Sequence, residues 1–295
     1  MSEEKKSKDS LGDRMKGQEM AEGGRCFLPG VPVCIRLDGR GFSRYTKGLH
    51  RPFDERLSGI MVELTKVLVS ETNALIGYTQ SDEISLVLYE PNTSETTYFG
   101  GRIQKTVSMT AAVATAHFNR LAALSLPEKS GKIAYFDSRA WSVPTLMEAA
   151  NCLLWRELDA TKNSISMAAQ GFFSHKVLHG KTGAEKQEMM FQKGVNWNDY
   201  PAFFKRGTYV TRVEKSTPFT KEELDSLPER HQARTNPDLV VVRHCIEARD
   251  FPPMPSVKNR VGVFFHGETP EVLDKGPLAD RMDLPKHERV EHEAS

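Results

Sequence analysis

Asp38 and Asp82 are the side chains in this sequence best suited to chemistry. Asp38 closes an apolar run and is followed by Gly39, and Asp82 precedes Glu83 in a short polar segment between two other apolar runs. Two carboxylates placed side by side repel each other unless a cation lies between them. Mg²⁺ prefers oxygen ligands and is commonly held by one or two carboxylates together with substrate phosphates. The pair therefore predicts a site for Mg²⁺-assisted phosphoryl transfer, to which Gly39 can add its carbonyl.

Each of these two segments, taken alone, is more typical of a simple turn, because Asp-Gly and Ser-Asp pairs are common at turns. Their joint setting favours the metal site. The segment Arg36–Phe42 is followed by a helical pattern and then by Tyr78–Glu83. This is the order that a palm-type polymerase core requires.

The elements predicted around the carboxylates alternate between strands and helices. We expect a strand at Val31–Leu37, a helix at Phe53–Leu68, a hairpin of Leu75–Thr79 and Ile84–Tyr89, a helix at Ile103–Leu121 and a strand at Lys132–Phe136. Asp82 lies near the tip of the hairpin. The order strand, helix, hairpin, helix, strand predicts an α+β fold with a ferredoxin-like palm, in which helices cover one face of an antiparallel sheet. The other face is expected to be open for a ligand.

Further elements are expected on both sides of this core. They are helices at Leu11–Glu22, Pro144–Asp159 and Ile165–Leu178, a helical segment within Pro218–Pro237 with a capping pair of Thr220 and Glu223, and strands at Leu239–Val242 and Val261–Phe265. We predict a catalytic palm domain over residues 1–213. Residues 214–295, after Val213, form a C-terminal appendage without a signal for chemistry.

Composition narrows the class of protein. The chain has 295 residues, of which 39% are hydrophobic and 27% charged, as in a globular protein with a sizeable core. Its formal net charge of +1 gives no support from bulk charge for nucleic-acid binding. No stretch approaches the roughly 18 apolar residues of a membrane span, so no membrane partner is expected. The 4 cysteines lack the spacing of metal ligands, which favours a reducing, cytoplasmic location.

Between Leu11 and Gly207 the sequence resembles the tRNA(His) guanylyltransferases and their 3′–5′ polymerase-like relatives. The resemblance rests on a series of short segments in a fixed order. They are Leu11–Lys16, Arg36–Phe42, Arg51-Pro52, Gln80–Glu83, Arg102 with Lys105, Phe136–Arg139, Trp155–Asp159, Glu185–Glu188 and Phe204–Gly207. Such a series is far more specific than any single motif.

The resemblance implies a catalytic site and a reaction. Asp38 and Asp82, with the Gly39 carbonyl, would bind two Mg²⁺ ions, and Glu83 would lie beside them as a third catalytic carboxylate. The substrates would be the 5′ end of a tRNA and GTP, ATP or another nucleoside triphosphate. A triphosphate activates the 5′ end if it is a monophosphate, and the 3′ hydroxyl of the incoming nucleotide then attacks it. Relatives also imply a homo-tetramer.

Cationic and hydroxyl side chains would hold the phosphates. By resemblance Arg102 and Lys105, three residues apart on one helix face, bind triphosphate, and Arg51 stands where many members have Lys. Arg40 and Ser81 are further candidates for phosphate contacts. Lys186 is a weaker candidate, because an ordinary solvated helix face also accounts for such a lysine. Trp141, Trp155 and Trp197 can stack on bases, although burial is the commoner fate of tryptophan.

One departure from the family pattern concerns the substrate. Eukaryotic-type members carry a His-x-Asn-Asn segment that is tied to the choice of tRNA(His). Here Thr161 stands in place of that His, and only Asn163 matches. This resembles the bacterial, archaeal or phage type, whose members repair 5′-truncated tRNAs. Three alternatives stay open: a strict tRNA(His) guanylyltransferase, a nucleotide cyclase with the same palm carboxylates, and a non-catalytic nucleotide- or RNA-binding module.

Overall fold

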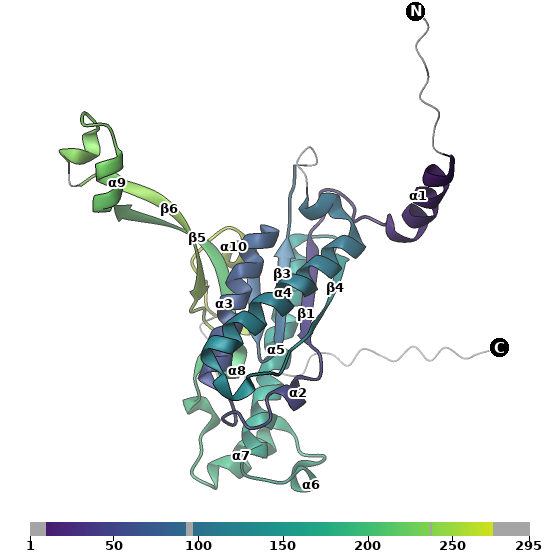
Figure 1. Cartoon of the computed structure of the whole chain (residues 1–295). Coiled ribbons are helices and arrows are strands. Elements are labelled where there is room, and N and C mark those ends of the chain that lie inside the picture. The colour runs from purple at the N-terminus through teal and green to yellow at the C-terminus, as the bar shows by residue number, and fades with distance from the viewer. Residues whose placement is uncertain (1–9, 93–96, 237, 274–295) are drawn as a thin grey trace, which may run out of the picture.

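The fold is built around one six-stranded antiparallel sheet, seen in a computed structural model that describes residues 10–92, 97–236 and 238–273 (Figure 1). The strand order is β4-β1-β3-β2-β5-β6. The strands are β1 (Val33–Gly39), β2 (Ile76–Gln80), β3 (Glu83–Leu88), β4 (Phe136–Ser142), β5 (Thr208–Pro218) and β6 (Val240–Arg249). The first four have the 4-1-3-2 order of a split βαβ unit, so the predicted ferredoxin-like palm is confirmed.

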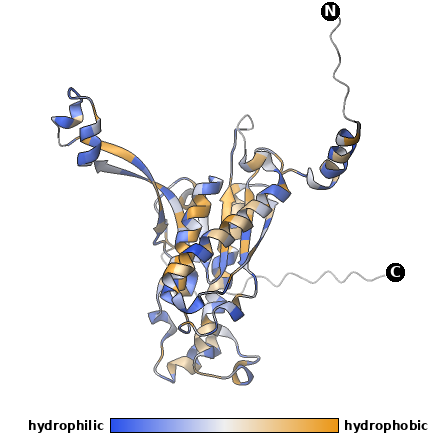
Figure 2. Cartoon of the chain, in the orientation of Figure 1, coloured by the Kyte–Doolittle hydropathy of each residue, from blue (hydrophilic) through white to orange (hydrophobic). Residues whose placement is uncertain are grey.

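Two long helices cover one face of the palm. Figure 1 shows α3 (Glu55–Thr72) and α4 (Ile103–Ser125) side by side across the strands. Alternate strand residues point towards them, because side chains in a strand alternate between the two faces. The resulting core is fully buried and joins strand and helix residues, among them Ile35, Leu37, Ile84, Leu86, Leu64, Leu68 and Phe118. In Figure 2 these strands are among the most hydrophobic parts of the chain.

The prediction that the second face is open was wrong for most of that face. The helix α5 (Leu146–Gln170) packs against it, and Cys34 and Val87 of the sheet contact a cluster that includes Ala149 and Leu153. Small side chains such as Ala149 let the helix approach the strands closely. Asp38 and Glu83 lie at strand ends, towards the edge of the surface that α5 covers. A ligand that binds on this face is therefore expected near these two residues.

Two elements have bounds that differ from the predicted ones, and in both cases side chains form hydrogen bonds with backbone groups. Residues 132–135 form no strand, since the amide and carbonyl of Ala134 bond to the Asn119 side chain at 3.0 and 2.8 Å, and β4 starts at Phe136 instead. The two helices predicted within 144–178 are mainly one, α5. Thr161 and Ser164 bond their hydroxyls to carbonyls one turn back, so these polar residues do not end the helix.

The remaining helices are short apart from α1, which lies away from the sheet in Figure 1. They are α1 (Ser10–Gly23), α2 (Phe42–Tyr45), α6 (His175–Leu178), α7 (Gly183–Phe191), α8 (Ala202–Arg206), α9 (Lys221–Ser226) and α10 (Arg260–Phe265), with 3₁₀ turns η1 (Tyr98–Gly101), η2 (Pro127–Lys129), η3 (Trp197–Asp199), η4 (Gln232–Arg234) and η5 (Met254–Ser256). The predicted strand at Val261–Phe265 was wrong, because this apolar run is α10; so short a run does not distinguish a helix from a strand. Among the described residues no helix is long and apolar enough to cross a bilayer.

The strands β5 and β6 extend beyond the palm as a two-stranded arm that ends in α9 (Figure 1). The predicted capping box is present: Glu223 N donates to Thr220 Oγ1 at 3.2 Å, and Thr220 N donates to Glu223 Oε2 at 2.8 Å. Arg243 of β6 binds the same Glu223 carboxylate and ties α9 to the arm. The division of the chain after Val213 stays a prediction, and Val213 itself lies within β5.

Candidate active site at the ends of β1 and β3

The ends of β1 and β3 bring the predicted carboxylates together. Asp38 lies directly opposite Glu83 across the strand pair, and the Gly39 amide donates a hydrogen bond to the Asp82 carbonyl at 3.2 Å. Asp38 also lies opposite Asp137 of β4. Directly opposed residues share one face of a sheet. Asp137, Asp38 and Glu83 therefore form a row on the face that α5 partly covers, with Asp82 beside its end.

The turn between β2 and β3 sets the position of Asp82. Ser81 adopts φ 55°, in the left-handed region, and its hydroxyl donates to Asp82 Oδ1 at 3.1 Å. Burial, and next the nearby charge of Asp38, raise the pKa of Asp82 to about 6. Two negative charges are therefore costly at this position without a cation, which is the electrostatic character of a metal site.

The absence of a side chain at Gly39 is required for packing. A Cβ atom at this position would lie 2.2 Å from the ring of Phe42, so no larger residue fits without a shift. The Phe42 ring in turn packs on Phe118 and Phe136 in the core. This contact fixes the backbone between Asp38 and α2.

The donor set of this region suits a hard cation that also binds substrate phosphates. The backbones of Asp38, Gly39 and Asp82 lie next to one another at one edge of the sheet, and the charge of Asp38 acts on the Asp82 carboxyl. Across the part of the chain that the structure describes, no group of three or more His, Cys, Asp or Glu side chains is arranged to hold a metal. Mg²⁺ needs only one or two carboxylates when phosphates complete its coordination. The residues present therefore fit Mg²⁺ better than a metal that needs a cage of protein ligands.

Glu83 is held by an arginine from α5. Both of its carboxylate oxygens face Arg156, whose Nη2 lies 2.7 Å from Oε2, and a second Arg156 nitrogen contacts Oε1. The same guanidinium also reaches Asp159 at 3.0 Å. Burial raises the pKa of Glu83, and the hydrogen bond from Arg156 opposes that rise. The sequence marked this arginine only as part of the segment Trp155–Asp159.

A cleft of about 270 Å³, here called the Asp82 cleft, opens beside the carboxylates. Its polar lining includes Arg51, Ser81 and Asp82, and its apolar lining includes Phe53 and Phe203. A volume near the lower limit of small-molecule sites, about 300 Å³, with apolar walls and a few polar groups is typical of a ligand pocket. It has an apolar part for a base and a polar part for phosphates.

A buried carboxylate that the sequence did not mark, Asp54, lines this cleft. Asp54 caps α3 by accepting from Arg56 N at 3.0 Å, and it also accepts from His50 N at 3.3 Å. The Arg56 guanidinium binds Asp54 and reaches Glu128 at 2.6 Å. The hydrogen bond from Arg56 is the main cause that lowers the pKa of Asp54 to about 2. Its place before a helical pattern is the sequence signal for such a cap.

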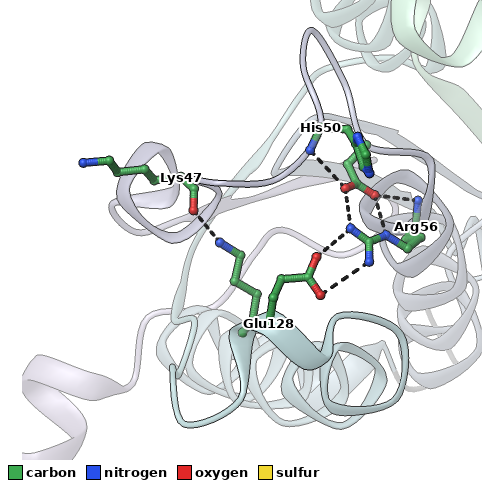
Figure 3. Close-up of polar contacts among 6 residues, drawn as sticks. Lys47, His50, Arg56 and Glu128 are labelled. Atoms are coloured by element: carbon green, nitrogen blue, oxygen red, sulfur yellow. Dashed lines mark hydrogen bonds and ion pairs between the residues drawn. The ribbon is translucent and has the colours of Figure 1, made fainter.

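A lysine fixes the preceding loop from the same side. Lys129 Nζ donates to the Lys47 carbonyl at 2.7 Å (Figure 3). The loop from Lys47 to Asp54 is therefore attached both to η2 and to the start of α3.

The predicted phosphate-binding residues lie in two separate places, near the Asp82 cleft and at the start of α4, and the weaker candidate Lys186 lies in neither. Ser81 and Arg51 line the Asp82 cleft, and Arg40 directly follows β1, with its amide bonded to the Tyr135 carbonyl at 2.8 Å. Lys186, on α7, instead donates to Ser166 at 3.1 Å and is not part of the cleft lining.

Arg102 and Lys105 form the second group and lie at the start of α4. Arg102 forms a β-bridge with Cys26, and Lys105 Nζ lies 4.9 Å from the centre of the Phe99 ring. The adjoining η1 borders a separate cleft beside Val33, the first residue of β1. The structure thus places these two cations at the opposite end of β1 from Asp38, and one chain does not bring them to the carboxylates.

Comparisons with known proteins show the family of this chain. The family model described as tRNAHis guanylyltransferase matches residues 12–144. The tRNA(His) guanylyltransferase of Saccharomyces cerevisiae is 32% identical over 204 residues, which cover 63% of this chain and 84% of the yeast protein. That of Neurospora crassa is 29% identical over 218 residues, 67% of this chain and 73% of its own.

Solved structures show the same similarity. A bacterial tRNA(His) guanylyltransferase-like protein in complex with ATP superposes with a TM-score of 0.65 and 40% identity, covering 68% of this chain and 88% of that chain. A bacterial protein of the same description in complex with GTP gives a TM-score of 0.59 and 36% identity, covering 69% of this chain and 86% of that one. The tRNA(His) guanylyltransferase of S. cerevisiae gives 0.57 and 30%, covering 63% and 88%.

Proposed function

The chain belongs to the tRNA(His) guanylyltransferase family, and from this premise we propose that it is a nucleotidyltransferase that adds nucleotides to the 5′ end of tRNA in the 3′–5′ direction. Its nucleotide substrates are ATP, GTP and other nucleoside triphosphates. The observation that carries the proposal is that Asp38 and Gly39 lie next to Asp82, which lines a cleft of about 270 Å³.

In the proposed site Asp38, Asp82 and the Gly39 carbonyl would hold Mg²⁺, as two ions. Bound there, the metal would neutralise charge that develops on the attacking and leaving oxygens. The chain itself would position the reactants: Arg51 and Ser81 line the Asp82 cleft and can contact the phosphates of a nucleotide, while Phe53 and Phe203, packed on each other at 5.2 Å, form an apolar wall for its base. Phosphoryl transfer depends mostly on positioning and charge, so no nucleophilic side chain is required.

Glu83 and Arg156 position the active site and do not react with the substrates. Their ion pair joins β3 to α5 next to Asp38. A rigid support of this kind holds the metal-binding carboxylates in one geometry, which phosphoryl transfer needs. The roles given by resemblance to Arg102 and Lys105 stay predictions, as do the tetramer and the cytoplasmic location.

The proposed substrate is a 5′-truncated tRNA rather than tRNA(His) alone. Thr161 stands where the histidine of the eukaryotic type would be, and its hydroxyl bonds to the Glu157 carbonyl within α5 at 2.9 Å. The identity to the bacterial structures, 40% and 36%, exceeds the 30% to the yeast structure, which supports the same choice. The names of the curated relatives favour the strict tRNA(His) alternative. None of the relatives named above is a cyclase.

The test supplies the purified protein with labelled nucleotides and two RNAs. One is tRNA(His) lacking its extra 5′ residue, and the other is a 5′-truncated tRNA of another specificity. We expect Mg²⁺-dependent extension of both. Extension of tRNA(His) alone would refute the repair proposal, and release of a cyclic nucleotide without RNA would support the cyclase.

A further inference from the structure

Trp155 on α5 is unusually accessible for a tryptophan. It is 51% exposed, although large aromatic side chains are mostly buried. It lies on the same side of the sheet as the carboxylate row, because its neighbour Arg156 reaches Glu83 there. The proposed active-site chemistry leaves this ring unused.

Two guanidinium groups lie against the ring. The centre of the Trp155 ring is 4.5 Å from Cζ of Arg156 and 5.7 Å from Cζ of Arg36. Arg156 is fixed by Glu83 and Asp159, both through bonds to its guanidinium. Arg36 lies on β1, so both cations belong to the layer between the ring and the sheet. About half of the Trp155 side chain, 51%, stays exposed with these two cations in place.

Arg36 also has a hydrogen-bond donor without a partner among the described residues. This donor is its buried Nε. It lies two residues before Asp38 on the same strand face, opposite Ser85 and Arg139. An anion that arrives beside Trp155 would thus meet a cation on the route to the carboxylates.

We propose that Trp155 is a stacking platform for an unpaired nucleotide at the acceptor end of the RNA, with Arg36 beneath the ring. This inference rests on the proposed function, since it assigns a surface to its RNA substrate. A flat aromatic ring above guanidinium groups suits a base and its phosphate, which is how single-stranded nucleic acid is bound without sequence choice. A base inside a duplex has both faces covered, so the occupant is an unpaired one.

The incoming nucleotide is a different occupant with its own place. The Asp82 cleft is lined by Phe53 and Phe203, whose rings pack on each other with centroids 5.2 Å apart, whereas Trp155 does not line that cleft. The position next to Asp38 and Glu83, where the RNA end must come, favours RNA.

The test compares Trp155→Ala, Trp155→Phe and, as a matched control, Phe191→Ala on α7, where the phenylalanine is 64% exposed. RNA binding is measured without nucleotide or Mg²⁺, by titrating a 5′-truncated tRNA and following tryptophan fluorescence and gel mobility. Trp155→Ala is expected to weaken binding by about 5- to 150-fold, the range for loss of one stacked base, and Trp155→Phe to recover part of it. Phe191→Ala should bind as the parent does.

Steady-state kinetics separate stacking from a structural effect on Glu83. We expect Trp155→Ala to raise KM for tRNA and to leave KM for ATP unchanged. A fall in kcat with unchanged RNA binding, or a rise in KM for ATP alone, would overturn the proposal, as would equal RNA binding by all four proteins. If the parent binds RNA through Trp155 but never adds a nucleotide, the proposed function fails and the platform stands.

Discussion

Arg156 on α5 binds both carboxylate oxygens of Glu83 on β3, across the face of the palm that carries the candidate metal site. The two side chains are only 13% and 17% exposed. The pair explains how a buried glutamate can be tolerated next to Asp38. It also joins α5 to the sheet next to the carboxylate row.

Removal of Arg156 should therefore cost more than removal of an exposed charge. Arg156→Gln leaves Glu83 buried without its partner, and we expect a loss of about 3–5 kcal/mol in the free energy of unfolding. The double variant Glu83→Gln/Arg156→Gln should recover a large part of this loss. Urea unfolding of the parent, both single variants and the double variant measures the coupling. A loss below about 0.5 kcal/mol, the value of an exposed pair, would contradict the buried ion pair.

Asp54 and Glu128 give a second comparison, because both contact Arg56 but only Asp54 is buried. Asp54→Asn keeps a good N-cap for α3 but removes the buried charge that binds Arg56, and should lower stability by about 1.5–3 kcal/mol. Glu128→Gln removes a contact whose side chain is 39% exposed and should lower stability much less than Asp54→Asn does. ATP binding should also weaken more in Asp54→Asn, since Asp54 and His50 line the Asp82 cleft. Equal effects of the two variants in thermal unfolding and ATP titration would argue against this role of Asp54.

Alanine substitutions at Gly39 and Gly59 test whether the close approach of Gly39 to the Phe42 ring affects stability and activity. Gly39→Ala places a methyl group 2.2 Å from the Phe42 ring, and we expect overpacking to cost about 1–3 kcal/mol and to reduce nucleotide addition. Gly59 lies in α3 with open space around it, so Gly59→Ala should stabilise the protein by up to about 1 kcal/mol. Thermal unfolding and activity of the two variants check this. The same response from both would show that the contact with Phe42 is not decisive.

Glu157 predicts a dependence of stability on pH. It is 2% exposed, Tyr209 donates to it at 2.8 Å, and burial raises its pKa from 4.5 to about 7. The folded protein therefore keeps a proton that the unfolded chain loses above pH 4.5. This contribution is fully present below that pH and is lost as the pH rises through about 7.

The matched variant is Glu157→Gln, which does not titrate. Relative to it, the parent should lose up to about 1.4 kcal/mol per pH unit between about pH 5 and pH 7, and the difference should level off above about pH 8. Urea unfolding at intervals of half a pH unit measures the slope. A difference that stays constant with pH would show that Glu157 is ionised in the folded protein.

The sequence predicted those parts of the fold that local patterns control. Regular apolar spacing located α3 and α4, and alternation with a polar turn located the hairpin around Asp82. The cover of the second face by α5 was not predictable, because it depends on which surface the small residues of that helix meet. The start of β4 was missed for a similar reason, since Asn119 lies far from Ala134 in the sequence and supplies its backbone bonds.

In the candidate site too, local motifs were predictable from the sequence, whereas contacts between distant residues were not. Asp38, Gly39 and Asp82 belong to short motifs, and they meet as expected from the ends of adjoining strands. The partner of Glu83 comes from a helix 73 residues further along the chain. Arg102 and Lys105 carried only a helix-face pattern, which does not reveal that α4 starts at the far end of β1.

The most direct test of the account is nucleotide addition to a 5′-truncated tRNA by Asp38→Ala and Asp82→Ala, measured against the Mg²⁺ concentration. We predict that both variants keep the melting temperature and RNA binding of the parent and lose Mg²⁺-dependent addition, by at least about 100-fold in rate for a metal ligand. Full activity of either folded variant would contradict the assignment of these two carboxylates as the metal site.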